Sequence, residues 1–180
     1  MAAMRGTWWR LLAAKFLLVA LGAAWADTGN IHRLRQPLVS DQGKTVHFQD
    51  WRGKPLILAM EYANCRFICS ITLQRLRDVQ AAADRAGIAY DFLVVSLDPK
   101  NDTPAAWRRY RKSRELDRAN WTFLTASEKD TPIIARQLGV RYWWYDEHIM
   151  HDFRLLRVDA QGEVVGVMET YDSDPDAFVR

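Results

Sequence analysis

The sequence predicts an α/β sandwich of the thioredoxin-like type, with one β-hairpin near its N-terminus and another near its C-terminus. Three observations lead to this prediction. Residues 56–60 are apolar at every position, which is typical of a strand buried on both faces of a sheet. Cys65 and Cys69 follow this strand where a helical pattern begins. Further apolar strands then alternate with helical segments, and the pattern ends in two strands joined by a short turn.

Length and composition predict one domain with a packed core, because the 180 residues are 49% hydrophobic and 26% charged, as in ordinary globular proteins. The formal net charge of +3 comes from Arg5, Arg10 and Lys15, and the chain beyond residue 26 is balanced. This balance predicts no binding of nucleic acid, which requires clustered Lys and Arg. A basic run at 108–114 lies at helical spacing, with acidic residues close behind it. This arrangement favours a solvated helix face.

Residues 1–26 are typical of a cleavable export signal, with basic residues, then the apolar stretch 11–24, then Ala24-Trp25-Ala26. The apolar stretch is short for a membrane-spanning helix, so we expect cleavage after Ala26. The mature chain 27–180 would then be one thioredoxin-like domain, soluble and periplasmic or otherwise extracytoplasmic, without a membrane span. It would be membrane-anchored if the signal were kept.

The first half of the mature chain predicts an irregular arm and a hairpin. Residues 27–35 are polar and unpatterned. Residues 38–40 and 44–48 flank a short loop that contains Gly43, which predicts the first β-hairpin. A turn at 50–55 then leads into the buried strand.

A regular alternation of helices and strands is predicted after this strand. Apolar residues recur on one side of a helix that starts near Cys69 and ends at Gly87, and 92–95 form another buried strand. The later elements are a helix that starts at the 102–104 cap and runs to 116, a strand at 121–124, a helix from 130–132 to Gly139, a terminal hairpin of 153–158 and 163–168, and a last helical turn at 174–175.

The two cysteines carry the chemistry of the predicted site. At the start of a helix, backbone N–H groups and the helix dipole favour the thiolate form of a cysteine. With Cys69 in the first helical turn and Cys65 just ahead of it, both sulfur atoms can converge on one soft metal ion. The same placement permits a disulfide, which an oxidising compartment favours. Both alternatives stay open on the residues alone.

An imidazole would complete a copper site, since two thiolates and one nitrogen suit Cu(I) and tolerate Cu(II). For His32 and His47, in the arm and the first hairpin, we expect surface or capping roles. His148 and His151 lie in what we expect to be a loop before the terminal hairpin. In a thioredoxin-like fold, that loop approaches the cysteine turn.

The mature chain resembles the Sco/SenC family of copper proteins over residues 38–171. Four segments carry the resemblance, namely 53–55, the Cys65–Cys69 spacing, 95–104, and 124–125 followed by 138–140. The third segment is the most specific, because two cysteines separated by three residues are common.

The resemblance implies that Cys65, Cys69 and His151 hold one copper ion, as Cu(I) or Cu(II). The family's copper histidine stands eleven residues before the glycine of the last hairpin, as His151 stands before Gly162. His148 is then an outer neighbour of the site or a surface residue. The resemblance also aligns Asp98 with an acidic residue near the copper, while a turn residue before Pro99 is an equal alternative.

Three positions depart from the family pattern. Arg66 and Ser70 stand where the family usually has Pro, and Ala63 stands where Thr is usual. Without these prolines the loop is less constrained, so we expect the copper affinity or redox potential to differ while every ligand is kept. The adjacent Trp143 and Trp144, with Tyr145, are expected to pack over the loop, with a partner-docking patch as the alternative.

The function that the resemblance implies is that of a copper metallochaperone. It would deliver copper to the binuclear copper site in the copper-bearing subunit of cytochrome c oxidase, or to another periplasmic copper protein. The alternative from a different class is a thiol-disulfide oxidoreductase in which Cys65 attacks a partner disulfide and Cys69 resolves it. A thiol peroxidase fits less well, since its chemistry requires a Thr near the attacking cysteine and neither position 62 nor position 63 is Thr. A purely structural disulfide is the remaining alternative.

Overall fold

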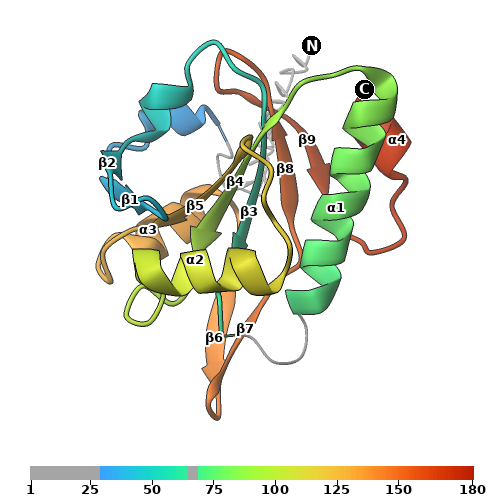
Figure 1. Cartoon of the computed structure of the whole chain (residues 1–180). Coiled ribbons are helices and arrows are strands. Elements are labelled where there is room, and N and C mark those ends of the chain that lie inside the picture. The colour runs from blue at the N-terminus through green and yellow to red at the C-terminus, as the bar shows by residue number, and fades with distance from the viewer. Residues whose placement is uncertain (1–28, 65–68) are drawn as a thin grey trace, which may run out of the picture.

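A sheet flanked by helices on both faces forms the centre of the molecule (Figure 1). The computed structural model describes residues 29–64 and 69–180, without the side chains of residues 69 and 70, and within these ranges the sheet has seven strands. They are β1 (Leu38–Ser40), β2 (Thr45–Val46), β3 (Leu56–Glu61), β4 (Asp91–Ser96), β5 (Trp121–Thr125), β8 (Leu155–Val158) and β9 (Val164–Met168). Their order across the sheet is β2-β1-β5-β4-β3-β8-β9.

Four α-helices and two short 3₁₀ helices surround this sheet in the described part of the chain. They are α1 (Cys69–Ala86), α2 (Pro104–Ser113), α3 (Thr131–Gln137), α4 (Pro175–Phe178), η1 (Ile31–Arg33) and η2 (Phe48–Trp51). A separate two-stranded sheet is formed by β6 (Tyr142–Tyr145) and β7 (His148–His151), and it extends from one end of the molecule (Figure 1).

The three central strands are parallel because helices connect them. β3 pairs with β4 and β4 with β5, while α1 and α2 form the two crossovers. All six residues of β3 are buried, and the apolar run predicted this for the first five. The carboxyl ends of these strands meet at one edge, so the loops that follow β3 and β4 are brought together there.

Two apolar cores lie on opposite faces of the sheet, because successive strand residues point to opposite sides. Leu58 and Met60 belong to the core covered by α3, η1 and η2. Ile57 and Ala59 belong to the core covered by α1, α2 and the C-terminal end of the chain. The site-bearing loops therefore rest on a sheet that is packed from both sides.

The predicted helices and hairpins are confirmed, with shifted ends. Thr103 caps α2, its hydroxyl accepting the N–H of Ala106, and Pro104 is the first helical residue. α2 ends at Ser113 rather than 116, and Glu115 just beyond it has a φ of 54°. The hairpins β1–β2 and β8–β9 are both antiparallel, as predicted.

Two expectations about secondary structure were wrong. The arm at 27–35 is not simply irregular, since residues 31–33 form η1, and Ile31 and the following Leu34 are buried in the core. The segment that holds His148 and His151 is not a loop, because both residues lie on β7. The chain turns between β6 and β7 at Asp146, whose φ of 54° is a conformation that aspartate tolerates better than most residues.

No helix in the described ranges is both long enough and apolar enough to cross a membrane. The predicted signal at 1–26 and the start of the mature chain at 27–28 lie outside those ranges.

Candidate metal centre

The predicted cysteine ligands belong to the connection between β3 and α1. Tyr62, Ala63 and Asn64 lead from the strand towards Cys65, which lies outside the described residues. α1 begins at Cys69, as the sequence predicted, but the side chain of Cys69 is not described. The described residues therefore show where this connection starts and ends on the fold.

His151 ends β7 and lies opposite Tyr142 of β6 in the antiparallel pair. Its imidazole packs edge-on against the ring of Tyr62, with ring centroids 6.5 Å apart and an interplanar angle of 79°. Tyr62 stands three residues before Cys65 in the chain. This contact places the predicted histidine ligand against the segment that leads into the predicted cysteine ligand.

The hydrogen bond of His151 determines which ring nitrogen carries the proton. Its Nδ1 lies 2.9 Å from the backbone carbonyl oxygen of Asp152, and a carbonyl only accepts, so Nδ1 is the protonated atom. In the neutral ring the lone pair is then on Nε2. Burial lowers the pKa of His151, against smaller opposing effects of Asp152. Burial therefore favours the neutral form that binds metal.

His148 occupies the opposite end of β7, where it pairs with Tyr145 next to the turn. Successive β7 residues alternate between the two faces of the hairpin. His148 and His151 are three positions apart, so they lie on opposite faces. Ile149 shares a face with His151 and is buried in the core, which identifies that face as the one towards the body of the protein. Of the two histidines, His151 is the one on the body side.

The aromatic residues of β6 are exposed rather than packed over a loop, so the favoured expectation for them was wrong. The exposed fractions are 51% for Trp143, 61% for Trp144 and 69% for Tyr145. Asp146 and Glu147 form the turn beyond them and are exposed as well. The hairpin thus ends in an aromatic and acidic tip, which consists of residues 143–147.

Two buried acids that the sequence analysis did not single out lie at the carboxyl ends of β3 and β4. Among the described residues neither carboxyl oxygen of Glu61 makes a hydrogen bond of good geometry, and burial raises its pKa to about 8. Thr72 and Arg114 oppose this shift and Asp102 adds to it. Burial likewise raises the pKa of Asp102 to about 7. The signal available for Glu61 was its position at the end of a wholly apolar strand.

Asp102 holds the start of the cysteine connection in place. Its Oδ1 accepts the backbone N–H of Ala63 at 3.0 Å, and its Oδ2 accepts the hydroxyl of Ser96 at 2.6 Å. The backbone carbonyl of Asp102 accepts the hydroxyl of Thr125 at 2.6 Å, which anchors the same loop to β5. The segment just before Cys65 is therefore attached to the loop that follows β4.

Asp98 is buried in the turn after β4. Its carboxylate accepts the side-chain amide of Asn101 at 2.8 Å, and its carbonyl accepts the N–H groups of Asn101 and Asp102. These bonds are those of a turn residue. Being a turn residue before Pro99 was one of the two alternatives expected for Asp98.

The two remaining histidines lie away from this site. His32 is buried rather than on the surface, and its Nδ1 lies 3.0 Å from the carbonyl oxygen of Gln161. His47 stands at the N-cap of η2, which is the expected capping position. Its backbone N–H donates to the carboxylate of Asp50 at 2.9 Å.

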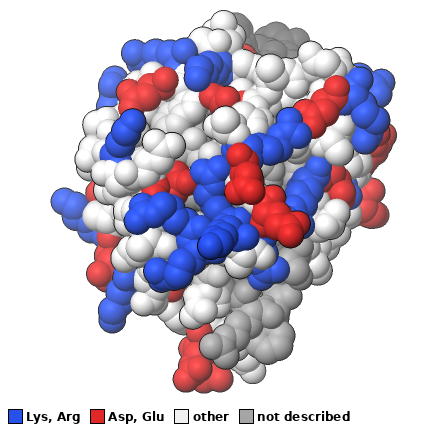
Figure 2. Space-filling model, in the orientation of Figure 1, with Lys and Arg blue, Asp and Glu red and all other residues white. Residues whose placement is uncertain are grey.

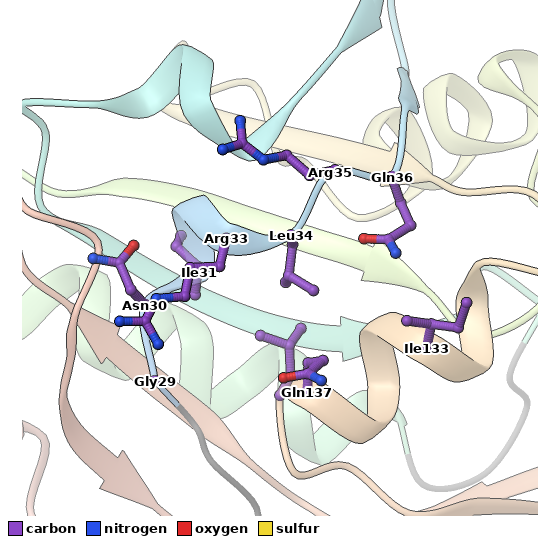
Figure 3. Close-up of a pocket in the computed structure, with 10 residues that line it drawn as sticks. Gly29, Asn30, Ile31, Arg33, Leu34, Arg35, Gln36, Ile133 and Gln137 are labelled. Carbon is purple, nitrogen blue, oxygen red and sulfur yellow. The ribbon is translucent and has the colours of Figure 1, made fainter.

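A pocket of about 350 Å³ lies between the N-terminal arm and α3 (Figure 3). Its walls include Leu34, Gln36, Ile133 and Gln137. None of the described residues that line it is His, Cys, Asp or Glu, so these residues offer no thiolate, imidazole or carboxylate to a metal ion.

In the part of the chain that the structure describes, no three His, Cys, Asp or Glu side chains converge on one point. A metal centre beside His151 would therefore need both cysteines as further ligands. Two thiolates and one imidazole would form a three-ligand donor set suited to copper.

The chain matches the family model described as SCO1/SenC over residues 31–180. A curated relative, the SCO1 protein homolog of Bacillus subtilis (strain 168), is 27% identical over 86 residues, which cover 48% of this chain and 45% of that protein. The match thus spans about half the length of that relative.

Solved structures confirm the thioredoxin-like fold. Arabidopsis thaliana ScoI with copper bound is 23% identical, with a TM-score of 0.70 over 79% of this chain and 90% of that one. BsSco, described as a member of the Sco family of cytochrome c oxidase assembly proteins with a disulfide switch, is 20% identical. Its TM-score is 0.71, over 83% of this chain and 90% of that one.

Proposed function

Because the chain belongs to the SCO1/SenC family, we propose that it binds one copper ion through Cys65, Cys69 and His151 and delivers it to the copper-bearing subunit of a cytochrome c oxidase. The contact between Tyr62 and His151 is the observation that carries this proposal. It brings a strand from residues 148–151 against the segment that leads to Cys65. A relative with the same fold holds copper.

Ligand exchange would perform the delivery. The start of α1 favours the thiolate form of cysteine, and the bond from His151 Nδ1 to Asp152 leaves the lone pair of the neutral ring on Nε2, which could then bind a metal ion. Thiolates of the receiving subunit would replace the protein's ligands one at a time. The cysteines regain protons when the ion leaves, and no substrate is turned over.

An extracytoplasmic location fits this role, because the export signal expected at 1–26 would carry the chain to the compartment of its receptor. The solved relatives include a SCO1/SenC family lipoprotein from Bacillus anthracis. We propose cleavage after Ala26 and a single domain over 27–180.

An anaerobic copper titration of the reduced protein tests the ligand set, with His151→Ala and His148→Ala measured in parallel. We expect one tightly bound copper and a thiolate-to-Cu(II) absorption band. His151→Ala should lose or shift the band and weaken binding by about tenfold or more. His148→Ala is the matched control and should keep the band. Equal effects of the two variants, or no stoichiometric copper, would contradict the assignment.

A thiol-disulfide oxidoreductase is the second candidate. The BsSco structure, described by its disulfide switch, favours it, because that relative shares the fold. In this reaction Cys65 would attack a partner disulfide, Cys69 would displace the partner's thiol, and the pair would end as a disulfide. His151→Ala should leave this reduction nearly unchanged while copper delivery is lost. If the variant affects neither activity, a structural disulfide becomes the better account.

A further inference from the structure

A pocket of about 480 Å³ opens beside the residues that precede Cys65. Three segments line it, namely the start of the β3–α1 connection at Asn64, the loop after β4 at Asn101 and Asp102, and α2 with its C-terminal cap, which contribute Arg109 and Arg114. The pocket therefore lies at the carboxyl ends of two parallel strands, where α/β proteins commonly bind ligands. Its volume is within the usual range for sites of small molecules.

Basic side chains dominate the charge of this pocket. Lys and Arg gather over the face that carries α2, with acidic side chains between them (Figure 2). Arg111 pairs with Asp41, but Arg109 and Arg114 take part in no salt bridge among the described residues. The Arg114 guanidinium lies over the ring of Tyr110, with its Cζ 5.7 Å from the ring centroid. A neutral ring does not cancel its charge.

The acid in the pocket wall offsets only part of the charge of these two guanidinium groups. Asp102 directs one carboxyl oxygen to the N–H of Ala63 and the other to the hydroxyl of Ser96. The pKa of Asp102 is raised to about 7, so at neutral pH this carboxyl group is partly protonated. The pKa of Glu61 is about 8, so Glu61 is largely protonated at the same pH. Glu115, the neighbour of Arg114, is exposed and is not part of the pocket wall.

We propose that this pocket binds carboxylate groups, with Arg109 and Arg114 as the cationic partners and the amides of Asn64 and Asn101 as hydrogen-bond donors. A guanidinium group matches the two oxygens of a carboxylate in a fork geometry, and polar amides suit the open rim. The carboxylates come either from a small free polycarboxylate or from an acidic segment of a partner protein. In both cases the ligand lies against the segment that leads to Cys65. The inference rests on the pocket and does not require copper.

Titration calorimetry on the copper-free protein tests the site with two probes, citrate and a blocked hexaglutamate peptide. Arg109→Gln should weaken binding of the better probe by about tenfold, the loss of one charge-assisted contact. Lys112→Gln removes the same charge from the same helix outside the pocket and should change binding by less than about twofold. Tighter binding of citrate identifies a free carboxylate as the ligand, and tighter binding of the peptide identifies an acidic segment.

Side-chain amide resonances provide a second readout that locates the ligand. The ¹⁵N-labelled side chains of Asn64 and Asn101 should shift on titration in the wild-type protein, and in Arg109→Gln they should shift only at about tenfold higher ligand concentration. Three results would overturn the proposal: no saturable binding of either probe, equal loss in Arg109→Gln and Lys112→Gln, or tighter binding of phosphate than of both carboxylates. Copper stoichiometry should stay unchanged in Arg109→Gln, so this test and the test of the metal site fail independently.

Discussion

At the scale of single residues, Glu61 is the least ordinary side chain of the described fold. It is 2% exposed, and among the described residues neither carboxyl oxygen makes a hydrogen bond of good geometry, although Thr72 lies close enough to lower its pKa. An ionised carboxylate in such surroundings is strongly destabilised. The residue therefore carries its proton in the folded protein at neutral pH, which agrees with its raised pKa of about 8.

The raised pKa of Glu61 predicts a stability that falls with rising pH. Because the unfolded chain loses this proton near pH 4.5 and the folded protein near pH 8, the folded state binds more protons between these values. Stability should decline across this window, by up to about 1.4 kcal/mol per pH unit, and level off above it. Glu61→Gln should match the wild type at pH 4 and be the more stable protein at pH 8. Urea denaturation at both pH values measures this.

Glu128→Gln is the control for that experiment, because Glu128 is exposed and its replacement should not change the pH dependence. A Glu61→Gln protein that keeps the wild-type slope of stability against pH would show that another group titrates in this window.

The candidate site was predictable in part, residue by residue. A cysteine at a helix start follows from local pattern alone, and α1 does begin at Cys69. The contact of Tyr62 with His151 joins positions far apart in the sequence, so no local pattern contains it. The same holds for Asp102, whose bond to Ala63 depends on the pairing of β3 with β4.

At the scale of elements, the β6–β7 hairpin is the feature that sequence reasoning missed. Tyr142–Tyr145 shows no alternation of polar and apolar residues, so it lacks the usual pattern of a half-buried strand. Its aromatic residues do have high strand propensity, and two residues separate it from His148–His151, which is the spacing of a tight hairpin. That combination was the available signal. The exposure of the tip depends on the rest of the fold, so the sequence of residues 143–147 alone could not predict it.

The exposed tip predicts a docking role that is separable from copper binding. Trp144→Ser should slow copper transfer to the isolated copper-bearing domain of the oxidase by about fivefold or more, since exposed tryptophans often dominate binding energy. Copper affinity should not change, because Trp144 is not a proposed ligand. Stopped-flow transfer kinetics and a copper competition titration measure the two quantities.

Ile133→Ser serves as the matched control for that prediction. Ile133 is 45% exposed on α3 and is not part of the tip, so its loss should leave transfer unchanged. Equal slowing by both variants would mean that general surface hydrophobicity, and not the tip, governs the encounter.

At the scale of the whole molecule, one ion pair joins the first hairpin to the helix layer. Arg111 of α2 contacts Asp41, the residue after β1, with Nη1 and Oδ2 2.6 Å apart, and the Asp41 side chain is 3% exposed. Arg108 adds a bond to the carbonyl oxygen of Asp41 at 2.7 Å. These contacts couple β1 and β2, at one border of the sheet, to α2.

Removal of Arg111 should destabilise the entire fold. Arg111→Met would leave Asp41 buried and unpaired, which costs about 3 to 5 kcal/mol in comparable cases. We expect this loss in the free energy of unfolding, from chemical denaturation followed by circular dichroism. Adding Asp41→Asn should restore part of it, because the isolated charge is then gone. A double variant as unstable as Arg111→Met would contradict the electrostatic explanation.

The strands themselves were more predictable from the sequence than their order in the sheet. Continuous apolar runs identified β3 and β4 because central parallel strands are buried on both faces. The neighbours of each strand were not predictable, since β1 pairs with β5 and β3 with β8 across long stretches of chain. The buried 3₁₀ turn η1 was missed because one turn is too short to show a period.

The hairpin that carries His151 belongs to a sheet of its own, with no strand paired to the seven-stranded sheet. Its tip can therefore be exchanged for that of another protein without disturbing the hydrogen bonds that hold the core. Such grafting would change the partner while the base, with His151 against Tyr62, stays in place. The hydrogen bonds of the seven-stranded sheet do not depend on the tip, so mutations in the tip can accumulate at little cost to stability.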